Sequence, residues 1–202
     1  AHYGAHESVR IPTFGRALTY EPTTCEVLVA ARNQVVRINL EEGRFVEPWA
    51  LDGTTATCID VHPLHPMAGA GCEDAAVRFW DSRAANVKPF LKLDVGAATF
   101  GYGYHDEYNR HANDVYSIAF DDSGLYMAAG CGSGVVALYD VRSSRPLFIQ
   151  EHKLGLPIHT VRFHTSSGLV LSSDEQLIKA WRYKPKSSLV DSSNNSDGGS
   201  VG

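Results

Sequence analysis

The segment SIAFDDSGLYMAAGCGSGVVALYD at residues 117–140 decides the fold of this chain. A strand of branched and aromatic residues leads to small residues, then a polar turn, then a second strand that closes on an aromatic ring. The segments CIDVHPLHPMAGAGCEDAAVRFWD (58–81) and TVRFHTSSGLVLSSDEQLIKAWR (160–182) follow the same order. Ile59 and Asp81 are 22 residues apart, as are Ile118 and Asp140. A repeated sequence unit of this kind predicts a repeated supersecondary unit.

The spacing of the repeats identifies that unit. The closing aromatics are Trp80, Tyr139 and Trp181, and a more divergent fourth copy ends at Ile38–Asn39. Tyr139 and Trp181 are 42 residues apart, and a period near 42 with several short strands is typical of a WD-type β-propeller blade of about 40–45 residues. No segment has sustained helical periodicity. We therefore predict an all-β WD-repeat β-propeller over residues 1–183 with about four blades, part of a seven-bladed ring.

Two segments break this rhythm. Trp80 and Tyr139 are 59 residues apart, and the 17 extra residues are DVGAATFGYGYHDEYNR at 94–110, which we interpret as an inserted loop. Residues 184–202 are mostly Ser, Asn, Asp and Gly, a composition that buries too little apolar surface to fold. We interpret 184–202 as a disordered tail or the start of an inserted loop.

Several residues match the structural positions of WD repeats. His111 begins the pattern H-xxx-V-xx-h-x-F-xxx-G of the third repeat, where h is a hydrophobe, and Asp74 lies six residues before Trp80, where a turn Asp is expected. In such repeats a His, a Ser or Thr, the turn Asp and the Trp form a buried hydrogen-bonded network. We assign this blade-pinning role to Asp74, Trp80, His111, Tyr139 and Trp181. No single repeat shows all the partners, since Ser133 and Tyr139 replace Asp and Trp in the third.

Composition narrows the function classes. The net charge of −5 disfavours a protein that coats nucleic acid through its phosphates, although five arginines crowd the first quarter of the chain. No run approaches the roughly 18 apolar residues of a membrane span, and no membrane partner is expected. The four cysteines form no CxxC pair, and Cys72 and Cys131, at matching repeat positions, are expected to be small buried hydrophobes.

Motifs for catalysis are missing from the sequence. It has no nucleophile elbow, phosphate-binding loop, HExxH motif or dinucleotide fingerprint. His62 and His65 lack a third metal ligand nearby. His105, Asp106, Glu107 and His111 form a denser set of potential ligands, but His111 is already assigned to the blade-pinning network. We predict no enzymatic activity, no metal, no cofactor and no small-molecule substrate.

The inserted loop is a candidate interaction site. Its glycines separate aromatic rings that can stack on bases or anchor a protein interface. An equal alternative is a loop that folds back and buries these rings on its own blade. The candidate residues are Phe100, Tyr102, Tyr104, Tyr108 and Arg110.

Four strings, which lie largely between the repeated segments, carry a family resemblance. RIPTFGR (10–16), VVRINLEEGRF (35–45), LYDVRSSRPL (138–147) and EHKLGLPIHTVRF (151–163) resemble the N-terminal propeller of the nucleolar protein 10 family, whose members are WD-repeat ribosome-biogenesis factors. The resemblance covers about residues 9–183. It implies a non-enzymatic scaffold of the small-subunit processome, located in the nucleus and nucleolus. Its implied partners are other ribosome-assembly factors, with pre-ribosomal RNA as a further candidate.

The same strings supply contact candidates. Arg10, Arg16 and Arg44 fall inside them, and the structural alternative is that they pair with Glu7, Glu41, Glu42 or Glu47. The alternative function is a generic WD-repeat adaptor for protein–protein interaction, unrelated to ribosome assembly, that reads peptides on the propeller face.

Overall fold

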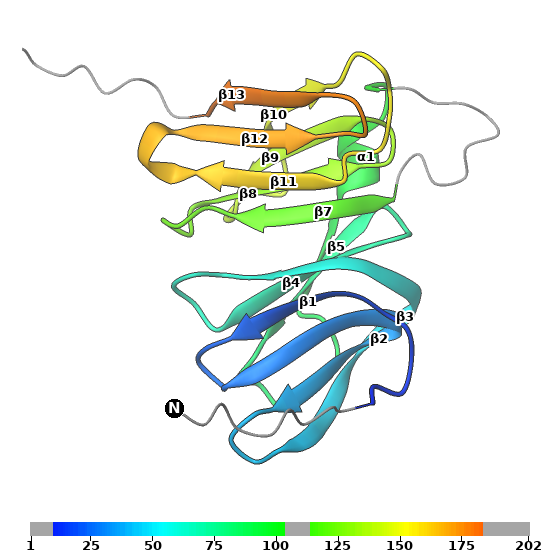
Figure 1. Ribbon diagram of the computed structural model, residues 1–202, viewed down its shortest axis with the longest axis vertical. Coiled ribbons are helices and arrows are strands. Elements are labelled where there is room, and N and C mark those ends of the chain that lie inside the picture. Colours follow the sequence, from blue (N-terminus) through cyan, green and yellow to red (C-terminus); the bar gives the residue numbers. More distant parts are fainter. Residues whose placement is uncertain (1–9, 104–113, 184–202) are drawn as a thin grey trace, which may run out of the picture.

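The computed structural model describes residues 10–103 and 114–183, which form three antiparallel sheets stacked along the long axis of the molecule (Figure 1). The strands are β1 (Gly15–Glu21), β2 (Glu26–Asn39), β3 (Arg44–Val61), β4 (Met67–Cys72), β5 (Ala76–Asp81), β6 (Leu91–Asp94), β7 (Val115–Phe120), β8 (Tyr126–Cys131), β9 (Val135–Asp140), β10 (Pro146–Glu151), β11 (Thr160–His164), β12 (Leu169–Ser173) and β13 (Ile178–Arg182). The helical elements are α1 (Val95–Thr99) and the 3-10 turn η1 (Thr165–Ser167).

The two longest strands, β2 and β3, each bend in the middle and so provide two of the strands that build the propeller blades. In β2 the chain reverses at Asn33, whose φ is 69°, and the Leu40 N–H donates to the Cys25 carbonyl oxygen at 2.9 Å across the resulting hairpin. In β3 the bend falls at Asp52 and Gly53, with φ values of 50° and 86°. Up to Ala50 β3 pairs with β2, and from Ala56 it pairs with β4; between them, Thr55 pairs with Arg32 of β2.

These reversals divide the six-stranded sheet into two blades. Blade 1 is β1, β2 and β3 up to Ala50; blade 2 is β3 from Ala56, then β4, β5 and β6. Blade 3 is β7–β10 and blade 4 is β11–β13, with three strands in the described part of the chain. The closing aromatics Trp80, Tyr139 and Trp181 lie at equivalent places in β5, β9 and β13. The predicted all-β propeller architecture is confirmed, and the seven-bladed ring stays a prediction.

The described part of the inserted segment contains one short helix. The sequence showed no helical periodicity, yet the inserted segment begins with helix α1. The helix has five residues, too few for a periodic pattern. It starts because the Asp94 carboxylate accepts the Ala97 N–H at 2.8 Å, and Val95 anchors it in the core.

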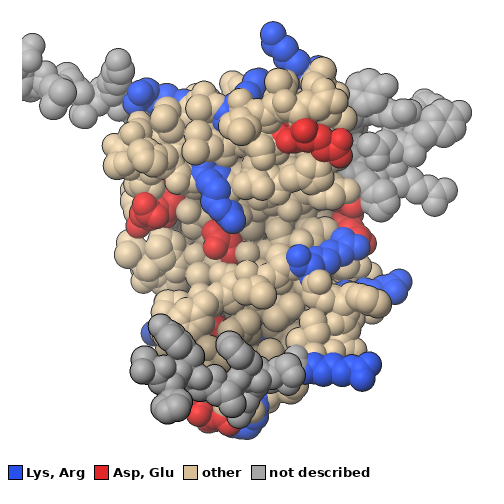
Figure 2. Space-filling model, in the orientation of Figure 1, with Lys and Arg blue, Asp and Glu red and all other residues tan. Residues whose placement is uncertain are grey.

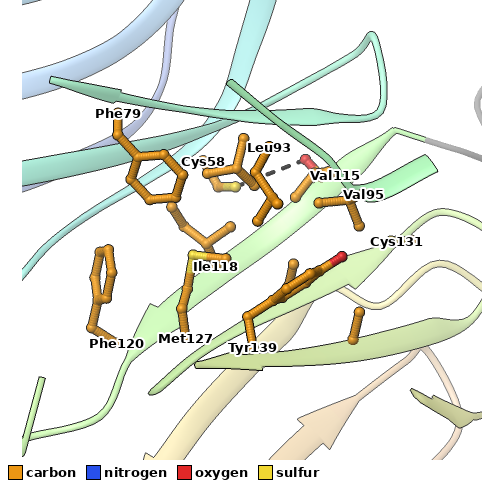
Figure 3. Close-up of a cluster of buried hydrophobic side chains, with 13 residues drawn as sticks. Cys58, Phe79, Leu93, Val95, Val115, Ile118, Phe120, Met127, Cys131 and Tyr139 are labelled. Carbon is orange, nitrogen blue, oxygen red and sulfur yellow. Dashed lines mark hydrogen bonds between the residues drawn. The ribbon is translucent and has the colours of Figure 1, made fainter. Parts of the chain in front are cut away.

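Hydrophobic cores lie between successive blades. Between blades 2 and 3, Phe79 and Leu93 from one side meet Ile118, Met127 and Tyr139 from the other (Figure 3). Between blades 1 and 2, the buried indoles of Trp49 and Trp80 stack in parallel with ring centroids 5.3 Å apart. A third cluster joins blades 3 and 4. Cys72 and Cys131 are fully buried free thiols, as predicted.

Small residues in the second strand of each blade permit this close packing. A Cβ atom at Gly71 would lie 2.7 Å from Val115 Cγ1 of the next blade, and one at Gly130 would lie 2.6 Å from Ile158 Cγ2. The two glycines occupy equivalent places in β4 and β8. The repeated small residues of the sequence are therefore contact points between neighbouring blades.

We expect Gly130→Ala to lower the free energy of unfolding and Gly130→Val to lower it further, by about 1–3 kcal/mol, because each added carbon must displace Ile158. Urea unfolding of the two variants beside the unmodified protein measures the series. Equal stability of all three proteins would contradict the packing argument.

Candidate interaction surface

The propeller topology collects two sets of loops at one face. Strands alternate in direction, so the loop before the first strand of each blade lies beside the loop between its second and third strands. We call this the loop face; it is the right-hand edge of Figure 1, from which the arrows of β7 and β11 point away. Residues 10–14, 51–55, 73–75, 95–103, 152–159 and 174–177 belong to it.

Arginines and one exposed phenylalanine gather where blade 1 meets this face. Arg16 and Arg32 line a shallow hollow with Phe14 and Glu73, and Arg10 and Phe14 line a second hollow beside it. The Phe14 side chain, shared by both hollows, is 86% exposed. We call Arg10, Phe14, Arg16 and Arg32 the arginine edge. Figure 2 shows blue side chains projecting along the right-hand edge of the lower half, on the side where β1 begins.

A β-bulge sets the position of Arg16. The pairing of β1 with β2 shifts register between Gly15 and Ala17, which leaves Arg16 as the extra residue. Blades 2 and 3 have the same shift, at Thr57 and Tyr116. Bulges redirect side chains away from the regular alternation of a strand. Here Arg16 Nη1 contacts Glu73 Oε1 of blade 2 at 2.6 Å.

The three arginines predicted from the sequence as contact residues lie on two different faces of the propeller. Arg10 and Arg16 share the arginine edge, whereas Arg44 begins the outer strand of blade 1 at the opposite face of the propeller. Arg44 Nε contacts Glu42 Oε2 at 2.5 Å, which is the structural alternative considered for it. Arg16 also pairs with a carboxylate, but Glu73 is far from it in the sequence. Arg10 and Arg32 have no ion-pair partner among residues 10–103 and 114–183.

The inserted segment lies on the same face as the arginine edge. Phe100 is 82% exposed and Tyr102 44% exposed, just after α1. Neither described ring is buried on its blade, and their role in binding stays a prediction. The candidates Tyr104, Tyr108 and Arg110, together with His111, lie outside the described residues.

A hydrogen-bonded His–Ser–Asp network occurs in blade 4. The His152 ring is fully buried between the Asp174 carboxylate, 2.8 Å from Nδ1, and the Ser172 hydroxyl, 2.8 Å from Nε2. A carboxylate only accepts, so Nδ1–H donates to Asp174, and the Ser172 hydroxyl completes the contacts of the ring at Nε2. Asp174 also accepts the Gln176 and Leu177 N–H groups, at 2.7 and 2.6 Å. The sequence pattern missed this network because Asp174 lies seven residues before Trp181 instead of six.

The residues assigned to blade pinning have more varied contacts. Asp74 forms a bidentate ion pair with Arg78, both distances 2.7 Å, and also contacts Lys92. Burial alone would raise the Asp74 pKa, but these hydrogen bonds outweigh it and place the pKa at about 2. Trp80 and Tyr139 are buried in the cores, while the Trp181 indole N–H has no hydrogen-bond partner among residues 10–103 and 114–183. A shared network for the predicted set remains a proposal.

The His62 ring is committed to structural contacts. Nδ1 of His62 accepts the Leu64 and His65 N–H groups at 3.1 and 3.0 Å, and Nε2 lies 2.8 Å from the Gly124 carbonyl oxygen. Burial lowers the pKa of His62. Within the part of the chain that the structure describes, no three His, Cys, Asp or Glu side chains gather into a potential metal site. No helix among these residues has the length and apolar character to cross a membrane.

Four-stranded antiparallel blades, packed face to face around repeated small residues, define a β-propeller of the WD-repeat class. The family model "Nucleolar protein 10-like, N-terminal domain" matches residues 1–196, and this chain belongs to that family.

Named relatives agree with this assignment. The chain is 34% identical to Nucleolar protein 10 of Xenopus tropicalis over 90% of its own length and 26% of the relative's. It is 30% identical to Ribosome biogenesis protein ENP2 of Saccharomyces cerevisiae over 88% of its own length and 24% of the relative's. The chain therefore spans about a quarter of the length of these relatives.

A solved structure supports the fold. A chain in the structure titled "Crystal Structure of Mitotic Checkpoint Complex" superposes with a TM-score of 0.66 at 21% identity. The match covers 86% of this chain and 49% of the other. At this level of identity the similarity concerns the architecture alone.

Sequence reasoning missed two members of the arginine edge. Phe14 stands inside the string RIPTFGR, between two arginines that were selected, and Arg32 was noted only as part of a basic quarter. The signal for Arg32 was its place at the hairpin of β2, beside Asn33. Its proximity to Arg16 depends on the pairing of β2 with β1 and could not be read from spacing.

Proposed function

We propose that this chain is a non-enzymatic scaffold in small ribosomal subunit biogenesis, acting in the nucleolus on pre-ribosomal particles. Membership of the nucleolar protein 10 family carries the proposal, because relatives in this family are named as ribosome biogenesis proteins. Other ribosome-assembly factors would be its direct partners, with pre-ribosomal RNA as a further partner.

The architecture supports a scaffold. Blades 1–3 are joined by continuous cores, and the loop face presents exposed side chains from successive blades to one side. Stacked repeat architectures of this kind provide extended binding surfaces more often than catalytic pockets. A rigid frame with a displayed loop face suits the holding of several partners at fixed distances.

Affinity purification of the tagged full-length protein tests this function. We expect precursor RNA of the small ribosomal subunit to co-purify, with large-subunit precursors as the control, and depletion of the protein to delay small-subunit RNA processing. Normal processing after depletion, with no small-subunit precursor in the purified material, would favour an adaptor unrelated to ribosome assembly.

A further inference from the structure

We propose that the arginine edge binds single-stranded RNA, with Phe14 stacking on an unpaired base and Arg10, Arg16 and Arg32 contacting the flanking phosphates. This inference rests on the proposed function and assigns RNA to one surface of the propeller. It also separates Arg10 and Arg16 from Arg44, which sequence reasoning had grouped with them.

The position of Phe14 is the first observation. Its ring is 86% exposed and lies between two hollows, each lined by at least one arginine. Single-stranded nucleic acid is bound by aromatic rings that stack on bases, set within a cationic groove that follows the backbone. The bases of a duplex are already stacked on one another and would not reach Phe14. The geometry therefore favours an unpaired strand.

The state of the arginines is the second observation. Among the described residues no carboxylate pairs with Arg10 or Arg32, so no ion pair there competes with a phosphate for either guanidinium group. Arg16 is held through Nη1 by Glu73, which fixes its position while the other N–H donors of the guanidinium group are left for a ligand. Glu73 is the one carboxylate among the residues that line the two hollows.

The charge of the whole chain makes the site selective. The formal net charge of −5 gives a polyanion no overall attraction to the chain, so a local cationic edge would direct it to one place. Several arginines around one exposed ring therefore stand out from their surroundings. An acidic protein segment is the competing occupant, and its binding would give a different result in the experiment that follows.

Fluorescence anisotropy with a labelled 12-nucleotide uridine RNA tests the proposal on the full-length protein. We expect Phe14→Ala to weaken binding about tenfold with an unchanged salt dependence, because it removes a stacking interaction. We expect the double variant Arg10→Ala/Arg32→Ala to lower the slope of log affinity against log salt by about 0.7 for each phosphate that is no longer neutralised. The same RNA as a duplex should bind more weakly than the single strand.

Two matched controls lie away from the edge. Arg44→Ala removes an exposed arginine at the opposite face, and Phe148→Ala removes a 54% exposed ring on β10. Both should bind the RNA like the unmodified protein. Phe14 is outside the cores, so its variant should keep the thermal unfolding midpoint, which confirms that any decrease in binding is local.

Several outcomes would overturn the inference. One is equal weakening by Arg44→Ala, which would indicate diffuse charge attraction; another is unchanged RNA affinity in Phe14→Ala. If that variant no longer associates with the pre-ribosomal particle while its RNA affinity is unchanged, the edge binds a protein instead. Failure of the unmodified protein to bind RNA, with small-subunit precursors still co-purifying, would reject this site and leave the proposed function intact.

Discussion

Replacing Asp174 by alanine is expected to lower the free energy of unfolding by about 3–5 kcal/mol, because it leaves a buried polar network without its acceptor. The Asp174 and His152 side chains are fully buried, and the carboxylate accepts from His152 and from two backbone N–H groups. Without it, the fully buried His152 Nδ1–H would have no acceptor, and the Gln176 and Leu177 N–H groups would lose the carboxylate that holds the turn. Urea unfolding at neutral pH measures the decrease.

The neighbouring variant Glu175→Ala is the control for this prediction. Glu175 is in the same turn, but its side chain is 62% exposed and lies 3.7 Å from His159. Removal of an exposed surface group usually changes stability by less than about 0.5 kcal/mol. A similar decrease in both variants would show that the turn tolerates no change, and that the network itself contributes little.

The contribution of Asp174 should also depend on pH. Burial alone would raise its pKa, but the hydrogen bonds from Gln176, His152 and Leu177 outweigh burial and hold the pKa below its ordinary value. A carboxylate with a depressed folded-state pKa stabilises the fold above its unfolded pKa of about 3.9, and this stabilisation is lost as the pH falls through the folded value. The stability difference between the unmodified protein and Asp174→Ala should therefore narrow below about pH 4.

Trp49→Ala is expected to cost about 3–5 kcal/mol of unfolding free energy, because it opens a large cavity between blades 1 and 2. The Trp49 ring is fully buried, stacks on Trp80 with an interplanar angle of 1°, and lies 4.7 Å below the Arg37 guanidinium carbon. Arg37 is itself held by Glu26, with contacts of 2.8 and 3.0 Å. Truncation of Trp49 would remove the centre of a stack that runs from an ion pair into blade 2.

Trp49→Phe provides the graded comparison. Phenylalanine keeps an aromatic ring and removes an indole N–H that has no hydrogen-bond partner in the described part of the chain, so we expect a cost well below that of alanine. Circular dichroism adds a readout specific to the pair, since the coupled signal of two stacked indoles should vanish in both variants. Equal stability of the alanine and phenylalanine variants would contradict the cavity argument.

Sequence reasoning recovered the parts of the fold that depend on local pattern. Strand periodicity, the 42-residue spacing and turn glycines such as Gly124, whose φ is 68°, all depend on residues close together in the chain. The stacking of Trp49 on Trp80 was not predicted, because Trp49 lies in an outer strand that is not part of the repeated segment. The network of His152 and Asp174 was not predicted, because one additional residue in the turn places Asp174 seven residues before Trp181 instead of six.

The arginine edge likewise depends on a contact between residues that are distant in the sequence, and sequence reasoning did not predict that contact. Arg10, Phe14 and Arg16 are neighbours in the sequence, but Arg32 joins them only through the pairing of β2 with β1. Arg44 looked equivalent in the sequence and lies at the other face because β3 begins there. Selecting residues by sequence string therefore found Arg10 and Arg16, whereas the place of Arg32 follows from strand pairing.

The continuous strand β3 has a consequence for how the chain folds during synthesis. The last strand of blade 1 runs directly into the first strand of blade 2, so completion of one blade places the start of the next with only the short bend at Asp52–Gly53 between them. Little loop entropy is then lost in bringing blade 2 to its partner. Blade 2 can therefore form on blade 1 as soon as its strands leave the ribosome, with the finished blade as its template.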